Sequence, residues 1–303
     1  MKENNHKLAL YLNIFNGIGD NSIKPIEKHD KDNEKVGYSH FKNNLNIDST
    51  PPLWRYFDLK GFLSFITSNE LYFRRIDKFE DGREGENLHF TKIKSELAQK
   101  GDKEEEERLE FMKTHDKIFQ ESCYVNCWRF DDKESPMMWG LYAKNTEGLA
   151  IKINYEDFIT FIDSLYFKLP IQKFNKKLGI PISNNDAILK DSYVLFLEKV
   201  IYEDFDKLLE KDNITVYQKY KFGLIKDIIY SYEKEIRLII RDKDINSSSE
   251  SGLNMPFDKE LLKSFTLVFH PKAETWYRNM IENLVKKLNV PIKCEKKSSL
   301  SYR

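Results

Sequence analysis

The clearest hydrophobic pattern in the chain is a strand–helix–strand unit that comes after a polar N-terminal region. Leu53–Phe57 is a short apolar run typical of a strand, with Arg55 at its centre. Asp58 is a good helix N-cap, and apolar residues then recur at the i, i+3, i+4 and i+7 positions of one helical face as far as Ile66. A second strand is expected over residues 71–73.

The rest of the chain mixes strands and helices. Apolar runs predict strands over residues 123–130, 149–153, 236–240, 267–269 and 290–294. Ser135 before Pro136 is a helix start signal. Another helix is expected where apolar residues recur every four positions, at Trp276, Met280, Leu284 and Leu288. The mixture predicts an α+β fold with mostly helical insertions near residues 86–120 and 155–230.

The first 50 residues differ in character from the remainder of the chain. Residues 18–50 are rich in Asn, Asp, Lys and His, which is typical of a loose arm, and an alternating patch at residues 8–14 predicts an edge strand. Pro51 and Pro52 end this region. We therefore expect a polar N-terminal arm over residues 1–50 and a single domain over residues 51–303.

Composition narrows the class of protein. Lys plus Arg equals Asp plus Glu, so the formal charge is zero and gives no general attraction to nucleic acid or anionic membrane. No stretch is long and apolar enough for a membrane span, and the N-terminus is a poor signal peptide. Three cysteines are few and odd in number, which favours a reducing compartment. We expect a cytoplasmic protein with no membrane partner.

Two kinds of chemistry find little support in the residue pattern. Cys123 and Cys127 would lie about 13 Å apart on a strand, and no histidine pair is near, so buried structural cysteines are expected and no metal. Phosphate-cradling glycine patterns such as GxxxxGK and GxGxxG are missing from the sequence. Kinase, ATPase and dinucleotide-binding Rossmann functions are therefore excluded.

The segment at residues 231–237, Ser-Tyr-Glu-Lys-Glu-Ile-Arg, is the sharpest candidate site. On a strand, Glu233, Glu235 and Arg237 would share one face, because the side-chain period is two. Its two carboxylates would lie about 7 Å apart, while Ile236 and its alternate neighbours face the core. Either this is a solvated strand face, or the carboxylate pair stabilises a positive charge or orients a ribose hydroxyl.

Two further segments carry candidate residues with an ordinary structural alternative. Trp139 and Tyr142 lie on a short predicted helix, where aromatic residues are more often core than ligand platform. Residues 79–85, Phe-Glu-Asp-Gly-Arg-Glu-Gly, form a compact turn whose glycines allow positive φ. A structural turn is the default interpretation, and a ligand-facing loop is the alternative.

Taken together, these segments resemble the bacterial family DUF2971, a domain of unknown function, over about residues 53–290. The resemblance is carried by a first strand and a subsequent Leu-Tyr-Phe, a turn, a Cys-led strand end, Met-Trp-x-x-Tyr-Ala, and Tyr-Glu-x-Glu-x-Arg. These elements occupy residues 53–56, 71–73, 79–85, 127–129, 138–143 and 232–237. Two departures are visible: Arg55 precedes Tyr56 where the family has tyrosine first, and Arg129 replaces the usual serine.

The order of a basic residue, an aromatic element and Glu-x-Glu also resembles ADP-ribosyltransferases. That resemblance implies a split, mostly antiparallel sheet whose cleft holds NAD. Glu235 or Glu233 would be the catalytic carboxylate that stabilises the oxocarbenium ion formed as nicotinamide leaves. The implied NAD-binding residues are Arg55, Tyr56, Trp139, Tyr142 and Arg237, with an arginine suited to the diphosphate.

These patterns leave three function classes open. The first is an NAD-consuming enzyme, an ADP-ribosyltransferase or NAD glycohydrolase, acting as a bacterial toxin or antiviral defence effector. The second is a non-enzymatic module that binds a nucleotide or peptide through the aromatic residues and Arg237. The third is a Mg²⁺-dependent nuclease built on acidic clusters at residues 131–134 and 233–235, against which the neutral charge counts.

Overall fold

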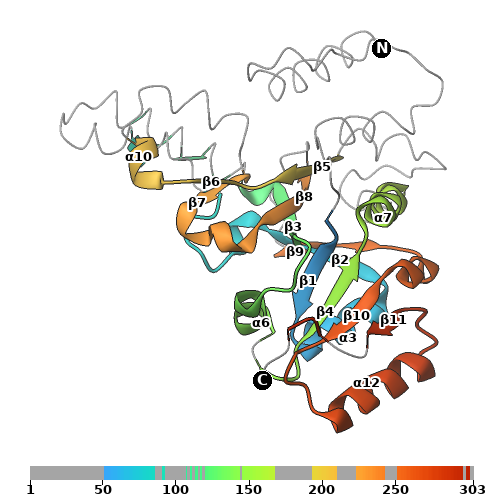
Figure 1. Ribbon diagram of the computed structural model, residues 1–303. Coiled ribbons are helices and arrows are strands. Elements are labelled where there is room, and N and C mark those ends of the chain that lie inside the picture. The colour runs from blue at the N-terminus through green and yellow to red at the C-terminus, as the bar shows by residue number, and fades with distance from the viewer. Residues whose placement is uncertain are drawn as a thin grey trace, which may run out of the picture.

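The structure is a computed structural model (Figure 1). It describes residues 51–85, 91–92, 120–143, 145–167, 193–209, 223–242, 251–295 and 298–300, with isolated positions between 107 and 117. The predicted arm at residues 1–50, with its alternating patch, lies outside the described residues. Most of the stretch predicted to be helical near 86–120 does so too, although Glu107, Glu110 and Lys113 within it are helical.

The secondary structure mixes strands, α-helices and short 3₁₀ helices. The strands are β1 Leu53–Phe57, β2 Glu70–Arg75, β3 Cys123–Phe130, β4 Leu149–Ile153, β5 Tyr193–Lys199, β6 Ile201–Glu203, β7 Ile225–Asp227, β8 Glu235–Asp242, β9 Gly252–Pro256, β10 Thr266–Phe269 and β11 Lys293–Glu295. The α-helices are α3 Leu59–Ser68, α6 Pro136–Tyr142, α7 Tyr155–Phe167, α10 Phe205–Leu209 and α12 Thr275–Lys287. The 3₁₀ helices are η1 Ile76–Lys78, η2 Ile228–Glu233 and η3 Lys259–Ser264.

The main sheet branches at β3. One edge of β3 pairs with β8, which in turn pairs with β5. The other edge pairs with β1 near Phe130 and with β2 near Tyr124, so β1-β4-β10-β11 and β2-β9 form two branches. These pairings are antiparallel except β10–β11, and β6–β7 form a small parallel pair. The predicted α+β class with a mixed, mostly antiparallel sheet is confirmed.

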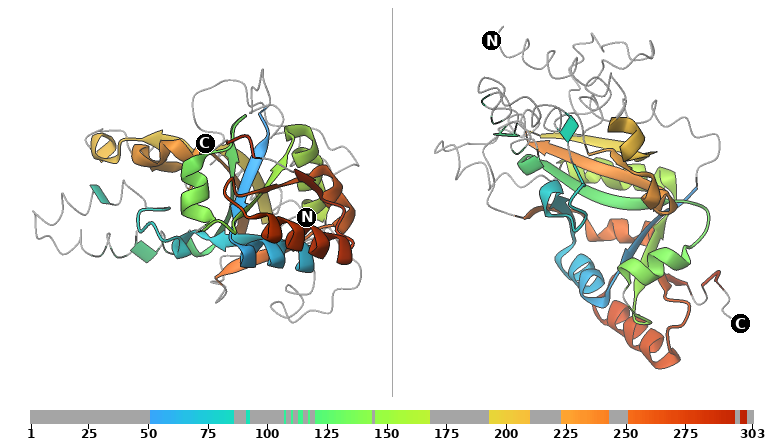
Figure 2. Two further views of the ribbon diagram at one scale, coloured as in Figure 1. Left: turned by 60° about the horizontal axis from the view of Figure 1, so that its bottom comes forward. Right: turned by 90° about the vertical axis from the view of Figure 1, so that its left-hand side faces the viewer.

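The two faces of the sheet are covered differently. On one face, which we call the first face, alternate strand residues pack with α3, α7 and α12 into one large apolar core. On the opposite, second face, α6 packs over β1, β4 and β10 as a smaller cluster that includes Trp54, Tyr56 and Trp139. Figure 2 shows α6 apart from the helices of the first face.

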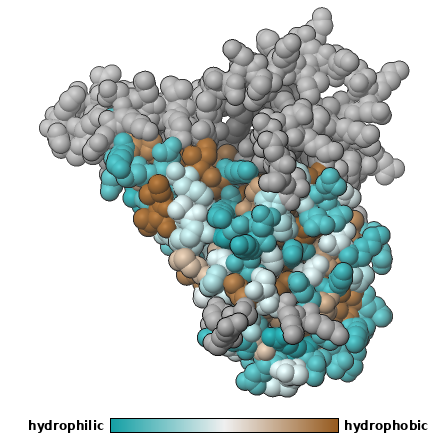
Figure 3. Space-filling model, in the orientation of Figure 1, coloured by the Kyte–Doolittle hydropathy of each residue, from teal (hydrophilic) through white to brown (hydrophobic). Residues whose placement is uncertain are grey.

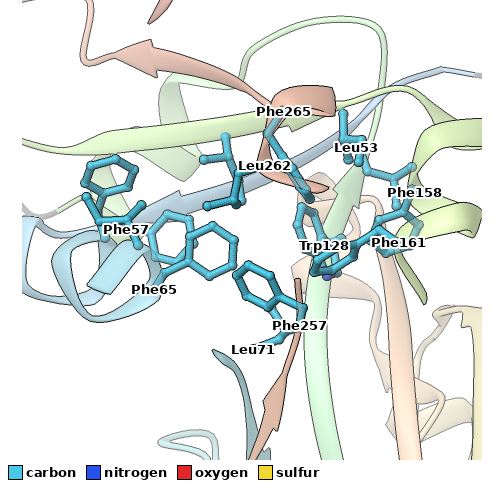
Figure 4. Close-up of a cluster of buried hydrophobic side chains, with 14 of the residues drawn as sticks. Leu53, Phe57, Phe65, Leu71, Trp128, Phe158, Phe161, Phe257, Leu262 and Phe265 are labelled. Carbon is cyan, nitrogen blue, oxygen red and sulfur yellow. The ribbon is translucent and has the colours of Figure 1, made fainter. Parts of the chain in front are cut away.

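Aromatic side chains dominate the first-face core (Figure 4). Phe161 meets Phe265 edge to face at 5.1 Å between ring centroids, and Trp128 meets Phe158 at 4.9 Å. Each fully buried side chain of this size contributes roughly 1.5–3 kcal/mol relative to an exposed one. This packing fixes β1, β3 and β8 as a rigid support for whatever their opposite sides carry.

Helix ends agree with the predicted signals. The Asp58 carboxylate accepts a hydrogen bond from the Gly61 amide at 2.8 Å, and Asn69 ends α3 in the left-handed conformation with φ 52°. Ser135 caps α6 by accepting from the Met138 amide, with Pro136 as the first helical residue. These local signals place α3 and α6 correctly because they do not depend on distant contacts.

The helix predicted from Trp276, Met280, Leu284 and Leu288 is confirmed as α12, but this apolar row is not the buried one. Trp276 and Met280 are 56% and 43% exposed, and the buried row is Tyr277, Ile281 and Val285. Two adjacent rows of this helix carry apolar residues, so spacing alone does not say which one faces the sheet. Tyr277 decides it, because its ring joins the core and its hydroxyl donates to the Glu147 carbonyl.

The described part of the stretch at 155–230 is less helical than predicted. It begins with α7, but β5, β6 and β7 also lie within it. The seven residues of β5 pair with β8 from Tyr193↔Asp242 to Lys199↔Ile236, a long-range contact that local pattern does not report. Strand β9, which pairs with β2, lies in a segment with no predicted element.

Candidate functional site

The second face changes from apolar to charged along β3 and β8. Val125 and Ile239 lie in a small apolar cluster, and the next residues on the same face are Cys127 and Arg237, which are cross-strand partners. Glu235 comes next on β8. A buried strand face that becomes charged between two apolar clusters is unusual, because buried charges are costly unless they are paired.

Five charged side chains meet at this place, and we call them the charge cluster. They are Glu84 from the turn after η1, Lys226 of β7, Glu233 at the end of η2, and Glu235 and Arg237 of β8. Each residue is less than 9% exposed. The cluster therefore lies inside the protein, and its members come from the turn after η1 and from the consecutive elements β7, η2 and β8.

Arg237 is the most deeply buried member, with no exposed surface. Its guanidinium binds Glu235 in a bidentate pair, Nε to Oε1 at 2.9 Å and Nη2 to Oε2 at 3.0 Å. Its Nη1 lies 2.6 Å from Oε1 of Glu84 and donates to the Gly223 carbonyl. This fork geometry is what makes arginine suited to buried carboxylates.

Lys226 links the three carboxylates. Its ammonium lies 2.7 Å from Glu233, 3.4 Å from Glu84 and 3.6 Å from Glu235. Three carboxylates and two cations leave one negative charge in excess if every group is ionised. Removing a partner from such a buried network strongly destabilises a fold, because an uncompensated charge remains.

The two neighbouring glutamates have opposite pKa shifts. Burial raises the pKa of Glu233, and its contacts with Lys226 and Tyr142 only partly offset that effect. Burial also acts to raise the pKa of Glu235, but its pair with Arg237 outweighs this and holds the pKa below its usual range. Glu235 is therefore fixed as an anion, whereas Glu233 is closer to taking up a proton.

Glu233 is connected to the surface through a tyrosine. The Tyr142 hydroxyl donates to Oε1 of Glu233 at 3.0 Å, and the Tyr142 side chain is exposed. Burial and the nearby carboxylates raise the pKa of Tyr142, so its hydroxyl keeps its proton as a donor. Glu233 is thus the carboxylate of the cluster that shares a hydrogen bond with an exposed aromatic side chain.

The candidate segment at residues 231–237 lies only partly on a strand. β8 starts at Glu235, Glu233 belongs to η2, and Lys234 between them is left-handed with φ 45°. The prediction that Glu233 shares a strand face with Glu235 and Arg237 is wrong. The turn at Lys234 nevertheless folds Glu233 back toward Lys226, so the three residues still meet.

Arg55 lies on the opposite face from the charge cluster. Its guanidinium lies over the rings of Phe57 and Trp128, 5.4 and 5.7 Å from their centroids, among the residues of the first face. Nη1 is 3.5 Å from the Cys127 carbonyl, and burial lowers the pKa of Arg55 to about 10. The described structure does not bring Arg55 together with Glu233 or Glu235.

Tyr56 and Trp139 lie on the second face but are packed into protein. Their rings meet edge to face at 4.9 Å, and each is less than 9% exposed. The Tyr56 hydroxyl accepts from the Ser135 amide, and the Trp139 indole donates to Glu134. Both residues hold α6 on the sheet, and Tyr142 at the end of α6 is the aromatic residue that reaches the cluster.

Sequence reasoning missed two members of the cluster. Glu84 belongs to the turn at residues 79–85. The sequence analysis interpreted that turn from its glycines and assigned no role to Glu84. Lys226 lies on β7, a three-residue strand that is separated from β8 in sequence only by η2 and Lys234. A glutamate inside an otherwise tight turn was the available signal for Glu84, and we find none for Lys226.

Cys123 and Cys127 both lie on β3 beside the second face. Cys123 is buried among apolar residues, and the partly buried Cys127 hydrogen-bonds Glu235, with burial raising its pKa. Within the described residues, no group of three or more His, Cys, Asp or Glu is arranged to hold a metal ion. In the charge cluster the position among the three carboxylates is taken by Lys226.

Fold and site together define an α+β protein with a branched, mostly antiparallel sheet and a buried Glu–Lys–Arg cluster beside an exposed tyrosine. Residues 138–238 match the sequence model of the protein family DUF2971, which is described as 'protein of unknown function'. This stretch contains Tyr142 and four of the five cluster residues, and it confirms the resemblance to DUF2971 there. No curated protein and no solved structure matches the chain.

The described surface carries an apolar patch beside the site. Ile228 and Ile229 of η2 are 49% and 67% exposed, and Figure 3 shows hydrophobic side chains gathered near β6 and β7 on an otherwise largely hydrophilic face. Among the described helices, none has the length and apolar character needed to cross a bilayer.

Proposed function

We propose that this chain is an NAD-consuming enzyme of the ADP-ribosyltransferase or NAD glycohydrolase type, with Glu233 as its reacting carboxylate. The observation that carries the proposal is the state of Glu233: a buried carboxylate with a raised pKa, held by Lys226 and by the hydroxyl of the exposed Tyr142. Buried carboxylates with a perturbed pKa and a specific charge partner are typical of functional sites.

The chemistry needs a carboxylate beside a developing cation. When the bond between the nicotinamide nitrogen and ribose C1′ breaks, nicotinamide leaves with the bonding pair and C1′ becomes an oxocarbenium ion. The excess negative charge of the cluster stabilises that ion. Water or a protein acceptor then forms the new bond to C1′, and its proton passes to Glu233, whose raised pKa suits a general base.

The remaining residues take supporting roles. Arg237 has no exposed surface and pairs with Glu235, so these two fix the cluster and do not grip the ligand. Tyr142 provides an exposed ring for the nicotinamide or ribose. Trp139 and Tyr56 pack between α6 and the sheet and hold the helix in place. Arg55 takes no part in NAD binding in this proposal, because it lies on the first face. We place the enzyme in the cytoplasm, as a toxin or defence effector.

The test is nicotinamide release from NAD by the full-length protein, with and without bacterial lysate as a source of acceptors. Glu233→Gln removes the general base and is expected to lower the rate by roughly 100-fold or more. Glu156→Gln, an exposed residue of α7, is the matched control and leaves the rate unchanged. Absence of release by the wild-type protein under both conditions contradicts the proposal.

One observation favours a second candidate, a non-enzymatic nucleotide-binding module. Glu235 and Arg237 are fully paired with each other, as expected of a structural network. In that case Glu233→Gln keeps nucleotide affinity within a few-fold, while Tyr142→Ala lowers it strongly, as isothermal titration calorimetry with NAD measures. Turnover of the bound nucleotide by the wild-type protein rules this candidate out.

A further inference from the structure

A buried carboxylate outside the charge cluster, Glu134, lies just before α6 and accepts four hydrogen bonds. It is 5% exposed. Its Oε2 accepts from the Trp139 indole at 3.1 Å and from the Ser298 hydroxyl at 2.6 Å. Its Oε1 accepts from both the amide and the hydroxyl of Ser299, at 2.6 and 2.8 Å. Three of the four donors thus come from residues 298–299.

The segment that supplies these donors comes after the last strand of the described chain. Ser298 also orders the segment itself, because its hydroxyl accepts from the Leu300 amide at 3.0 Å. Leu300 then packs, partly buried, against the apolar cluster of the second face. The described segment therefore presents two serine side chains and one apolar side chain to a single place.

The surface that receives this segment is rigid. The Ser135 amide, next to Glu134, donates to the buried Tyr56 hydroxyl, and the ring of Tyr56 packs on Trp139. Glu134 is thus aimed by residues that belong to the core of the second face. Hydrogen bonds to an ionised carboxylate are about twice as strong as neutral ones, so the amide and hydroxyls of one short segment suffice to hold it.

We propose that Glu134, Trp139 and the adjoining apolar cluster form a binding site for a short peptide segment carrying two serines and then an apolar residue. Residues 298–300 are its ligand within the same chain, where they act as a releasable strap over α6. The site does not depend on NAD chemistry, and it lies outside the charge cluster.

The strap is releasable because its polar attachment depends on one carboxylate, and only Leu300 adds an apolar contact. Ser299 is exposed, while its hydroxyl and amide contact Glu134. A negative charge placed on Ser299, as phosphorylation by a protein kinase with ATP would introduce, stands directly against that carboxylate and repels it. Release reaches the charge cluster through α6, because this seven-residue helix carries both Trp139 and Tyr142.

Hydrogen exchange measured by mass spectrometry on the full-length protein tests the attachment. Ser298→Ala combined with Ser299→Ala removes two hydroxyl donors, and the peptide containing residue 299 is expected to lose protection by about tenfold or more. Ser299→Glu is expected to lose more than the double alanine variant. Both changes lie on a partly exposed segment outside the large core, so the fold is retained.

A matched control exists for the carboxylate. Glu134→Gln weakens a buried carboxylate–indole contact and is expected to increase exchange at residue 299. The control is Glu274→Gln. Glu274 accepts a hydrogen bond from the Trp276 indole at the surface, and weakening that exposed contact is expected to leave exchange at residue 299 unchanged. Unprotected exchange at residue 299 in the wild-type protein, or equal protection in all variants, overturns the proposal.

A peptide binding measurement tests the receptor site itself. A labelled peptide with the sequence of residues 296–303, Lys-Lys-Ser-Ser-Leu-Ser-Tyr-Arg, is titrated with full-length protein and monitored by fluorescence anisotropy. It is expected to bind the Ser298→Ala, Ser299→Ala protein about tenfold more tightly than the wild type, whose own strap competes. Equal affinity for a peptide with glutamate at position 299 contradicts the proposal.

Discussion

At the scale of single residues, the separation of Glu233 and Glu235 is the most informative feature. The two glutamates are close in sequence and contact the same ammonium of Lys226, yet their pKa values shift in opposite directions. The difference lies in the guanidinium, which pairs directly with Glu235. Pairs of carboxylates whose environments separate their pKa values are how enzymes assign different roles to identical groups.

Arg237 is predicted to be the stability anchor of the cluster. Arg237→Leu leaves Glu235 and Glu84 buried without their guanidinium, which is expected to lower the free energy of unfolding by about 3–5 kcal/mol. Urea denaturation followed by circular dichroism measures it. Arg74→Leu, at an exposed position of β2, is the control and changes stability by about 0.5 kcal/mol or less. Equal effects of the two changes would disprove the anchor role.

Part of the site could be predicted from residue pattern alone. The period-two rule correctly places Glu235 and Arg237 on one face of β8 and Ile236 on the other. It also explains Arg55, which shares its face with the apolar Leu53 and Phe57 and is therefore turned to the first face. Glu84 and Lys226 could not be assigned in this way, because neither lies on β8 and the period-two rule applies only within one strand.

At the scale of elements, α6 determines where Tyr142 lies. Two glycines in or next to this helix differ in whether they leave room for a side chain. A Cβ on Gly148 would lie 2.1 Å from Cβ of Ala143 and 3.0 Å from its Cα, so the close return of the chain into β4 requires glycine. Gly140, inside α6, has no atom within 4 Å of such a Cβ.

This contrast gives a paired prediction. Gly140→Ala is expected to raise the free energy of unfolding by roughly 0.5–1 kcal/mol, because alanine restricts the unfolded chain and favours helix. Gly148→Ala is expected to lower it by about 1–3 kcal/mol, because the added methyl overpacks the junction. Thermal unfolding of the two variants measures both. A Gly148→Ala protein as stable as the wild type refutes the packing argument.

Elements with a clear local pattern were predicted well, including β3, β4, β8 and β10, whereas features set by distant partners were missed. The caps of α3 and α6 are short-range hydrogen bonds, so Asp58 and Ser135 identify them from sequence. Strand β5 exists through its pairing with β8, and the orientation of α12 depends on which of two apolar rows meets the sheet. Neither the existence of β5 nor the orientation of α12 can be predicted from a local residue pattern.

At the scale of the whole molecule, the branched sheet creates the place for the cluster. Because β3 pairs with β8 along one edge and with two different strands along the other, the large core occupies the first face without interruption. The second face is left with two small apolar clusters and the charged residues between them. The first-face core thus stabilises the fold enough to offset the free-energy cost of burying the charge cluster on the second face.

This arrangement predicts how overall stability depends on pH. The raised pKa of Glu233 means that the folded protein holds this proton to higher pH than the unfolded chain. Its contribution is therefore complete below the ordinary value of 4.5 and is lost as pH rises through the raised pKa. The free energy of unfolding of the wild type is expected to fall relative to Glu233→Gln over that interval, in urea titrations at successive pH values.

Glu235 makes the free energy of unfolding depend on pH in the opposite direction. Its lowered pKa gives stability that is present above the ordinary value of 4.5 and is lost as pH falls through the lowered pKa. The wild type is therefore expected to lose stability relative to Glu235→Gln on acidification, whereas the Glu233→Gln comparison changes at higher pH. Parallel curves for the two variants would contradict the separation of the two glutamates.

The most direct test of the central claim is a titration of the two side chains themselves. Carbon-13 NMR of the glutamate carboxyl groups, assigned with the Glu233→Gln and Glu235→Gln variants, reports each midpoint separately. The account predicts a midpoint above 4.5 for Glu233 and below 4.5 for Glu235. A Glu233 midpoint at or below 4.5 contradicts it, because Glu233 would then be an ordinary buried anion with no reason to be the reacting group.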